Sequence, residues 1–286
     1  MFDMRYHAAS LVAVLVALVV GLLLGVAIGD SGLVSSAERK VRESLRDDVR
    51  SAQQKADQSE ARLRAERRYS RASYPLLVAG ELDGRRIGLL FIGSASETIT
   101  EDVRTALQGS GGRLTGVLAM RIPPDLEAIA GSATGRLRRV DSNPKLLTPL
   151  GRRIGRQLIF GGGLLKREAA AVFSDRAGQV GEFDAIVIAR IPRDLDGPAA
   201  ANSARLENAV VSGIAGTRAA AVGVETSGTT PSQVEWYRTR GLSSVDDIDT
   251  TAGQAALVFA LGGAQGSFGS GPGAGSLLPG PEAVAR

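Results

Sequence analysis

The densest group of carboxylates lies near the C-terminal end of the chain, at Asp246, Asp247 and Asp249. Carboxylates at nearly alternating positions can bind a hard cation such as calcium or magnesium. Aspartate and threonine in front of a helix also form turns and N-caps, because their side-chain oxygens accept hydrogen bonds from free backbone N–H groups. A helix-like segment follows at residues 251–261. We therefore favour the turn and N-cap interpretation and assign no metal site to this group.

Soft metal ligands are scarce in the chain. It contains no cysteine, three methionines and a single histidine, His7, so neither a disulfide nor a thiolate metal site can form. Met4 and His7 lie one helical turn apart, a spacing at which both could face one copper ion. Two ligands make a weak site, and we interpret the pair as part of an interfacial segment at the membrane.

Two glycine-containing segments, at residues 93–96 and 161–163, follow apolar runs, as phosphate-binding loops do in α/β proteins. Neither has the GxGxxG or GxxxxGK[ST] spacing that brings backbone N–H groups and a lysine to a phosphate. Helix capping accounts for the two serines of the first segment. A degenerate nucleotide-binding domain is therefore kept as an alternative and is not the preferred interpretation.

Catalysis by a serine, histidine and aspartate triad is excluded within the predicted globular region, because His7 lies far outside it and no GxSxG segment occurs. We assign no catalytic, cofactor-binding or metal-binding residue, and we predict no enzyme activity.

The element that positions the rest of the chain is an uncharged, proline-free stretch at residues 8–28. Helical residues rise ~1.5 Å each, so this stretch extends ~31 Å and matches the ~30 Å hydrocarbon core of a bilayer. We predict a head at residues 1–7 and a transmembrane helix at 8–29, with the lipid bilayer as its first partner. A cleaved signal peptide is the alternative, with a weak cleavage pattern at 27–29, although its apolar region is usually only ~7–15 residues long.

Three glycines repeat every fourth residue in this helix, at Gly21, Gly25 and Gly29. Small residues at this spacing let two helices approach closely in lipid, so the pattern predicts a homo-oligomer. A general abundance of glycine in membrane helices is the alternative explanation. The basic residues on the two sides of the helix favour a cytoplasmic C-terminal portion, but they lie in a mixed-charge stretch, and the topology stays open.

The composition changes abruptly after the apolar helix. Residues 33–72 lack proline and are rich in helix formers, and Val41, Leu45, Val49 and Leu63 lie on a narrow apolar stripe. We predict a coiled-coil-like stalk that pairs in parallel, with a single solvated helix as the alternative. The basic cluster at 62–68 contains an acid and no aromatic residue, so we interpret it as a solvated face and predict no nucleic-acid partner.

Residues 75–261 alternate short apolar runs with helix-like segments. Strands are predicted at 86–92, 113–120, 183–191 and 218–225. Helices are predicted at 98–107 with a Thr98–Glu101 capping box, across most of 124–174, at 203–214, at 231–240 with Pro231 in the first position, and at 251–261. Alternating strands and helices predict an α/β domain with a mostly parallel sheet. The remaining residues, 262–286, are rich in glycine, proline and serine, and they predict a disordered tail.

Both ends of the chain resemble a known family. Residues 5–7 (RYH), 10–14 (SLVAV), 17–18 (AL) and 21–25 (GLLLG) resemble the N-terminal signature of the mycobacterial copper transport protein family, actinobacterial proteins described as copper transport outer membrane proteins. Residues 243–249 (SSVDDID), followed by VFAL, are similar to the C-terminal portion of that family. The order of anchor, charged helix and α/β region also fits.

The resemblance implies a cell-envelope protein of copper efflux and copper homeostasis that forms a pore, with its bulk outside the cytoplasmic membrane. Copper is then the transported ion, and no ligand for it can be assigned to a residue. The predicted strands are short and buried, so a pore would have to form from helices packed through the glycine face. A membrane-tethered scaffold that binds an envelope protein partner is the alternative from another class.

Overall fold

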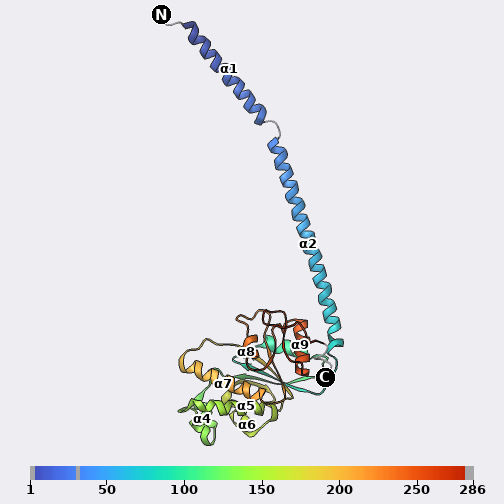
Figure 1. Ribbon diagram of the computed structural model, residues 1–286, viewed down its shortest axis with the longest axis vertical. Coiled ribbons are helices and arrows are strands. Elements are labelled where there is room, and N and C mark those ends of the chain that lie inside the picture. Colours follow the sequence, from blue (N-terminus) through green and yellow to red (C-terminus); the bar gives the residue numbers. More distant parts are fainter. Residues whose placement is uncertain (1–3, 30–32, 281–286) are drawn as a thin grey trace. The chain divides into compact units, whose positions relative to one another are not determined.

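The computed structural model describes residues 4–29 and 33–280, with side chains described from residue 6 to 27 and from 39 to 280. The chain divides into two units, Met1–Arg67 and Arg68–Arg286. Figure 1 traces the elements of both units.

The first unit is helical. Helix α1 (Met4–Gly29) contains the span Tyr6–Ala27, which is long and apolar enough to cross a membrane and has no buried residue. Helix α2 (Leu33–Val78) continues past residue 72 and through Pro75, and its last turns belong to the second unit. The predicted apolar helix and the long charged helix after it are confirmed; residues 1–3 of the predicted head and residues 30–32 lie outside the described residues.

The second unit is an α/β domain. Its strands are β1 (Arg86–Ile92), β2 (Arg113–Met120), β3 (Phe173–Gly178), β4 (Ala185–Arg190), β5 (Ala220–Val224), β6 (Ser243–Val245) and β7 (Ser267–Phe268). Its helices are α3 (Glu97–Leu107), α4 (Leu126–Ser132), α5 (Leu147–Phe160), α6 (Gly163–Val172), α7 (Gly197–Ala215), α8 (Val234–Arg238) and α9 (Thr251–Gly262), with short 3-10 turns η1 (Gly135–Arg139) and η2 (Pro144–Leu146).

The strands form one seven-stranded sheet in the order β3-β2-β1-β4-β5-β6-β7. All neighbours are parallel except β3, which pairs with β2 in the antiparallel direction. The prediction of an α/β domain with a mostly parallel sheet is confirmed.

Alternating residues of the central strands enter two separate cores. In β1, Leu90 and Ile92 face the core built with α5, α6 and α7, whereas Leu89 and Phe91 face the core built with α3 and α9. Helices therefore cover both faces of the sheet, and the strands read as continuous apolar runs because both of their faces are buried. Figure 1 shows α5, α6 and α7 on one side of the sheet and α9 on the other.

Three predicted helix starts are wrong. Helix α7 begins at Gly197, six residues before the predicted start at 203. Helix α3 begins after Ser96, whose side chain accepts a hydrogen bond from the Ile99 backbone N–H at 3.3 Å, so Thr98 lies inside the helix instead of capping it. Helix α8 begins at Val234, and Pro231 does not occupy its first position. Residues 231–233 form a loop instead, because Ser232 and the backbone of Gln233 donate hydrogen bonds to the buried Glu225 carboxylate.

The predicted helical middle ends too late. Helix α6 stops at Val172, and the next residues form β3 along the edge of the sheet. Only Phe173 of this strand is buried. A polar edge strand lacks the apolar alternation by which a half-buried strand is recognised in a sequence, which explains the missed strand.

The predicted disorder of residues 262–286 is wrong for the described part of the tail. Residues 267–268 form β7 beside β6, and Phe268 and Ala264 are buried. The Asp246 carboxylate also accepts hydrogen bonds from the backbone N–H groups of Ser270 and Gly271. The tail is therefore ordered by contacts with residues far away in the sequence; residues 281–286 lie outside the described residues.

Candidate functional site

The order of the strands defines where a ligand would bind in this kind of sheet. The chain leaves β1 toward β2 on one side and later returns through β4 on the other, so the direction of winding reverses between β1 and β4. Ligands of such sheets bind outside the carboxyl ends of the strands at this reversal. The loops there follow Ile92 and Arg190.

The loop after β1 is closed by backbone contacts. Gly93 has φ +111°, and a Cβ atom at this position would lie 2.5 Å from the Ile191 carbonyl oxygen. The glycine is thus required for close approach of two loops, and the serine side chain of Ser96 caps α3. The other glycine segment is closed as well, because the Gln157 side chain accepts a hydrogen bond from the Leu165 N–H at 2.7 Å. Neither described segment forms a phosphate cradle.

The acidic group at the carboxyl end of β6 organises loops. Asp246 holds the backbone of residues 270–271, with N–H to carboxylate distances of 3.0 and 3.1 Å. Asp249 accepts hydrogen bonds from the backbone N–H (2.8 Å) and the hydroxyl (2.6 Å) of Ser227. Thr250 caps α9 by accepting from the Gly253 N–H at 3.0 Å. The predicted N-cap is confirmed at Thr250, and two of the three aspartates have structural partners.

Two carboxyl groups at this end each have a buried oxygen that is less well satisfied. Asp247 Oδ1 and Asp102 Oδ2 have no hydrogen-bond partner among the described residues. Burial is the main reason that the pKa values of both carboxyls are raised, and Asp249 raises them further through its charge. Among the described residues, no group of three histidine, cysteine or acidic side chains is arranged to hold a metal ion.

A second polar cluster, centred on Arg190 at the end of β4, was not predicted. Its guanidinium donates hydrogen bonds to Glu207 of α7 at 3.0 Å and to Gln233 at 2.6 Å. The Arg190 backbone N–H donates to the Tyr237 hydroxyl at 2.8 Å, and that hydroxyl donates to the Val224 carbonyl at 3.1 Å. Burial raises the pKa of Tyr237. This cluster ties α7 and α8 to the sheet, but the sequence carries no local signal for it, because the partners are far apart along the chain.

The indole ring of Trp236 packs against the Arg190 side chain of this cluster. The guanidinium carbons of Arg190 and Arg240 each lie over the Trp236 indole ring, 4.8 and 3.9 Å from its centre. Burial lowers the pKa of Arg240, and the nearby Arg190 contributes to the shift. Arg240 also donates to the Asn208 side-chain oxygen at 2.6 Å. The cation–π contact with Arg190 holds α8 against the end of β4, and the hydrogen bond from Arg240 to Asn208 connects the same cluster to α7.

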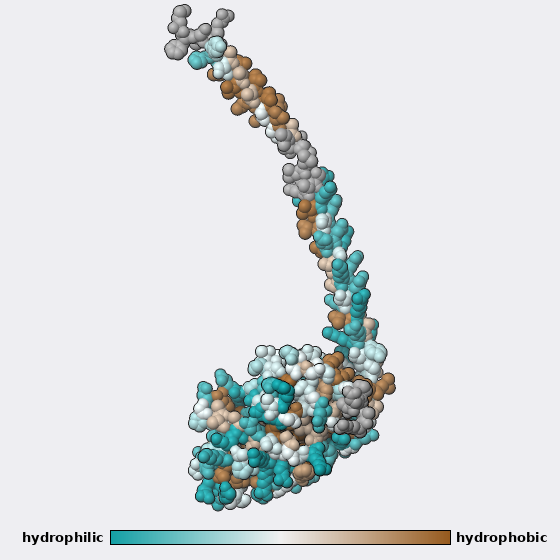
Figure 2. All heavy atoms as spheres, in the orientation of Figure 1, coloured by the Kyte–Doolittle hydropathy of each residue, from teal (hydrophilic) through white to brown (hydrophobic). Residues whose placement is uncertain are grey.

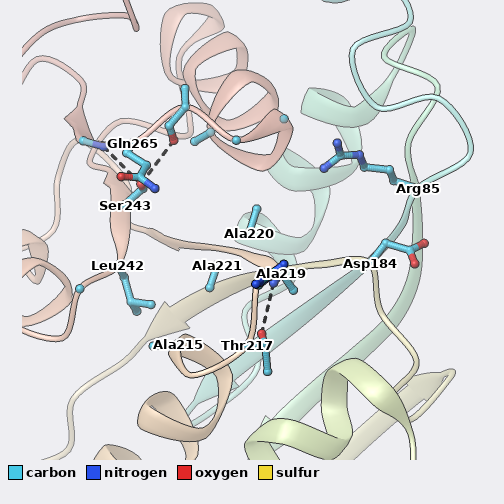
Figure 3. Close-up of a pocket in the computed structure, with 17 residues that line it drawn as sticks. Arg85, Asp184, Ala215, Thr217, Ala219, Ala220, Ala221, Leu242, Ser243 and Gln265 are labelled. Carbon is cyan, nitrogen blue, oxygen red and sulfur yellow. Dashed lines mark hydrogen bonds between the residues drawn. The ribbon is translucent and has the colours of Figure 1, made fainter. Parts of the chain in front are cut away.

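A cavity of about 700 Å³ lies at the opposite, amino end of the strands (Figure 3). Small side chains, Ala219, Ala220 and Ala221 among them, line much of it. Two of its three charged residues have partners within the domain: Arg85 donates to the Leu261 carbonyl at 2.8 Å, and Asp184 accepts from the Arg86 backbone and side chain. Hydrogen bonding to Arg86 is also the main reason that the pKa of Asp184 is lowered. Arg218 is the third charged residue of the lining and is exposed. The rest of the lining is uncharged, and we assign no ligand to this hollow.

The soft ligands do not converge on a copper site in the described part of the chain. Met120 is fully buried in the core on the α5 side of the sheet. His7 is exposed on α1, and the Met4 side chain lies outside the described side chains. Copper is accordingly treated as a transported substrate with no assigned ligand.

The first unit carries the remaining candidate surfaces. Every side chain of the span Tyr6–Ala27 is exposed, and a Cβ atom at Gly21 or Gly25 would meet no atom within 4 Å beyond the adjacent helix backbone. Gly29 ends α1, but its surroundings lie outside the described residues. The N-terminal apolar helix, long enough to cross a bilayer and followed by a long charged helix and an α/β domain, indicates a protein of the membrane or cell envelope.

The chain belongs to a family of copper transport proteins. The model of the family described as "Copper transport outer membrane protein, MctB" matches residues 1–122 and 167–279, well over half of the chain. The family functions in copper transport and copper homeostasis, and it is a family of transport proteins and not of known enzymes. No curated protein matches the chain.

Proposed function

We propose that the protein is a self-associating, membrane-anchored component of copper efflux, held in the cell envelope by α1 and placing its α/β domain outside the cytoplasmic membrane. The observation that most supports this proposal is the exposed apolar surface of the first unit. The span Tyr6–Ala27 is apolar on all sides and has none of its residues buried within the protein. Lipid and a second copy of α1 are the surroundings that suit such a surface.

The glycine face of α1 supports association within the membrane. Gly21 and Gly25 lie one helical turn apart and have open space beside them. In lipid, helices gain little from the hydrophobic effect, so close packing of backbones across small residues drives their association. A pore for copper would form where several such helices pack around one axis.

The exposed stripe of α2 supports pairing beyond the membrane. Leu45, Val49 and Leu63 are 57%, 55% and 51% exposed. With Ala52 and Ala56 they follow the alternating three- and four-residue steps of a coiled-coil seam. In a parallel pair this register brings Lys55 of one copy opposite Glu60 of the other. The alanines in the seam predict a weak pair that depends on the membrane helices.

The test of self-association replaces the glycine face. In Gly21→Ile together with Gly25→Ile, the branched side chains separate the helices while the segment stays apolar, so we expect crosslinked oligomers to fall at least about tenfold. Val19→Ile together with Leu23→Ile changes the opposite side of the helix and serves as the matched control. Unchanged crosslinking in the glycine variant would contradict the proposed oligomer.

The copper function is tested separately in a deletion strain that is complemented with each variant. We expect copper to accumulate in the deletion strain and in the glycine variant, and to return to normal with the control variant. Unchanged copper content and tolerance in the deletion strain would contradict the transport role. Capture of specific envelope proteins without a copper phenotype would favour the scaffold alternative.

The orientation is tested by adding protease to spheroplasts. A domain outside the cytoplasmic membrane is digested without permeabilisation, while a cytoplasmic marker protein stays intact. Digestion of the domain only after permeabilisation would place it in the cytoplasm and contradict this part of the proposal.

A further inference from the structure

The segment that contains η1, η2, α5 and the start of α6 is strongly basic on its surface. Every lysine and arginine between positions 135 and 167 is exposed, whereas Asp141 is the sole acidic residue in this range. The exposed cations are Arg136, Arg138, Arg139, Lys145, Arg152, Arg153, Arg156, Lys166 and Arg167. Figure 2 shows hydrophilic side chains over the part of the domain where Figure 1 places α4, α5 and α6.

These cations have no charged partners within the described part of the protein. No salt bridge involves them. Three exposed arginines elsewhere do have charged partners: Arg64, Arg104 and Arg238 each pair with a glutamate three or four residues away on the same helix. The uncompensated charge of residues 135–167 therefore creates a positive surface potential that attracts anions.

Helix α5 holds part of this charge beside an exposed aromatic ring. Leu150, Ile154 and Leu158 bury one side of the helix, and the other side exposes Arg152, Arg156 and then Phe160, one per turn. The Phe160 ring is 67% exposed, unusual for an aromatic side chain in a domain whose other phenylalanines are buried. A hollow of about 570 Å³ lies along this side, lined by Pro149, Arg152, Arg153, Arg156, Gln157, Phe160 and Gly161.

We propose that this basic face, defined as Arg152, Arg153, Arg156 and Phe160, binds the surface of an anionic lipid bilayer. The guanidinium groups pair with lipid phosphates, and the Phe160 ring enters the boundary between headgroups and acyl chains. The proposal goes beyond copper transport and self-association. It also does not follow from family membership, because residues 123–166 lie outside the matched ranges.

The composition of the face favours lipid over nucleic acid. Proteins that bind single-stranded nucleic acid combine a basic groove with several aromatic rings on which successive bases stack. Phe160 is the sole aromatic residue between positions 135 and 167. One exposed ring beside several cations suits a membrane surface, where each basic side chain contributes independently to the attraction.

The experiment uses the full chain in phosphatidylcholine nanodiscs, mixed with separate fluorescent vesicles that carry equal parts of phosphatidylcholine and phosphatidylglycerol. We expect co-flotation with these vesicles, little with pure phosphatidylcholine, and a loss of binding at high salt. The triple variant Arg152→Glu, Arg153→Glu and Arg156→Glu should weaken binding about 100-fold. Phe160→Ser should weaken it about tenfold and leave the salt dependence in place.

The matched control reverses three exposed arginines elsewhere in the domain, Arg113, Arg176 and Arg218, and so produces the same change in net charge. Urea unfolding followed by Trp236 fluorescence checks that each variant is folded, and Arg152→Gln with Arg156→Gln replaces the triple variant if that one is not. Equal binding to both kinds of vesicle, or an equal loss in the control, would overturn the proposal. Tighter binding to a single-stranded oligonucleotide than to anionic vesicles at the same salt would overturn it in favour of nucleic acid.

Discussion

Leu45 of the first unit and Leu90 of the second have the same side chain but very different solvent exposure. Leu45 lies on α2 and is 57% exposed, whereas Leu90 lies on β1 and is fully buried between neighbouring strands and α5. A helix forms all of its backbone hydrogen bonds internally, so the first unit keeps its secondary structure with its apolar side chains exposed. A sheet, in contrast, forms its backbone hydrogen bonds between strands that are distant in the sequence, such as β1 and β4.

The two units differ in what covers their apolar side chains. The α/β domain buries the apolar side chains of both sheet faces within itself, because helices cover both faces. The helices of the first unit expose their apolar side chains, and in the proposed function lipid covers those of α1 and a second copy covers those of α2. Substitutions in the domain should therefore change folding, and those in the first unit should change association.

The largest effect is expected from Leu90→Ala. Removing a fully buried leucine leaves a cavity, and we expect the free energy of unfolding of the domain to fall by about 3 kcal/mol. Leu45→Ala is the matched variant and should change the stability of the domain by less than about 0.5 kcal/mol. Trp236, the single tryptophan, lies in the domain and reports its urea unfolding. Equal effects of the two substitutions would contradict the division of roles.

A smaller effect is expected from Arg190→Met. The side chains of Arg190 and Glu207 are 21% and 8% exposed and lie 3.0 Å apart, so removing the arginine leaves a buried carboxylate without its charged partner. We expect a loss of about 2 to 3 kcal/mol, near the lower end for buried pairs because the arginine is partly solvated. Arg64→Met breaks the exposed pair with Glu60 in α2 and should cost less than about 0.5 kcal/mol. A double-mutant cycle with Glu207→Gln measures the coupling, and a coupling near zero would count against the Arg190 cluster as a stabilising element.

The smallest effect is expected from Asp247→Asn and depends on pH. Burial raises the pKa of Asp247 in the folded domain, so the folded state binds its proton more tightly than the unfolded chain does. This carboxyl therefore makes stability decrease as pH rises from its ordinary pKa through the raised value. The variant should have a flatter profile there and gain about 1 kcal/mol at neutral pH. A variant that is less stable at neutral pH would show that the charged form is favoured.

Asp184→Asn is a control, because the pH dependence of its effect on stability should have the opposite sign. Hydrogen bonds from Arg86 lower the pKa of Asp184, so its carboxylate contributes stability above its ordinary pKa, and that contribution is lost as pH falls through the lowered value. The variant should be less stable than the wild type at neutral pH, and the difference should shrink in acid. The same denaturation series measures both carboxyl variants.

Much of the fold was predictable from local patterns. The bounds predicted for β1 and β2 match those observed. Strand β1 is buried on both faces after Arg86 and reads as an apolar run, and β2 is buried at its C-terminal end. Helix α9 and its cap at Thr250 were likewise predictable, since capping involves residues that are adjacent in the sequence. The strands that were missed, β3, β6 and β7, are polar or very short, and pairing with a neighbouring strand is what makes them strands.

The candidate sites were less predictable. The aspartates at 246, 247 and 249 were recognisable as a group, but their partners could not be known, because Ser227 and Ser270 approach them only after folding. The Arg190 cluster was missed for the same reason, with partners at positions 207, 233 and 237. Phe160 could not be recognised as exposed until α5 was packed, since it directly follows the apolar residues Leu158 and Ile159 at the end of the helix.

The sequence by itself determined the apolar helix, the long charged helix, the α/β class of the domain and the resemblance to copper transport proteins. Each depends on composition or on periodicity within one segment. Only the tertiary structure decided which carboxylates hold loops, that the tail is ordered through residue 280, and that uncompensated arginines surround an exposed ring on α5. Those properties depend on distances between residues that are remote in the sequence, and such distances exist only once the chain has folded.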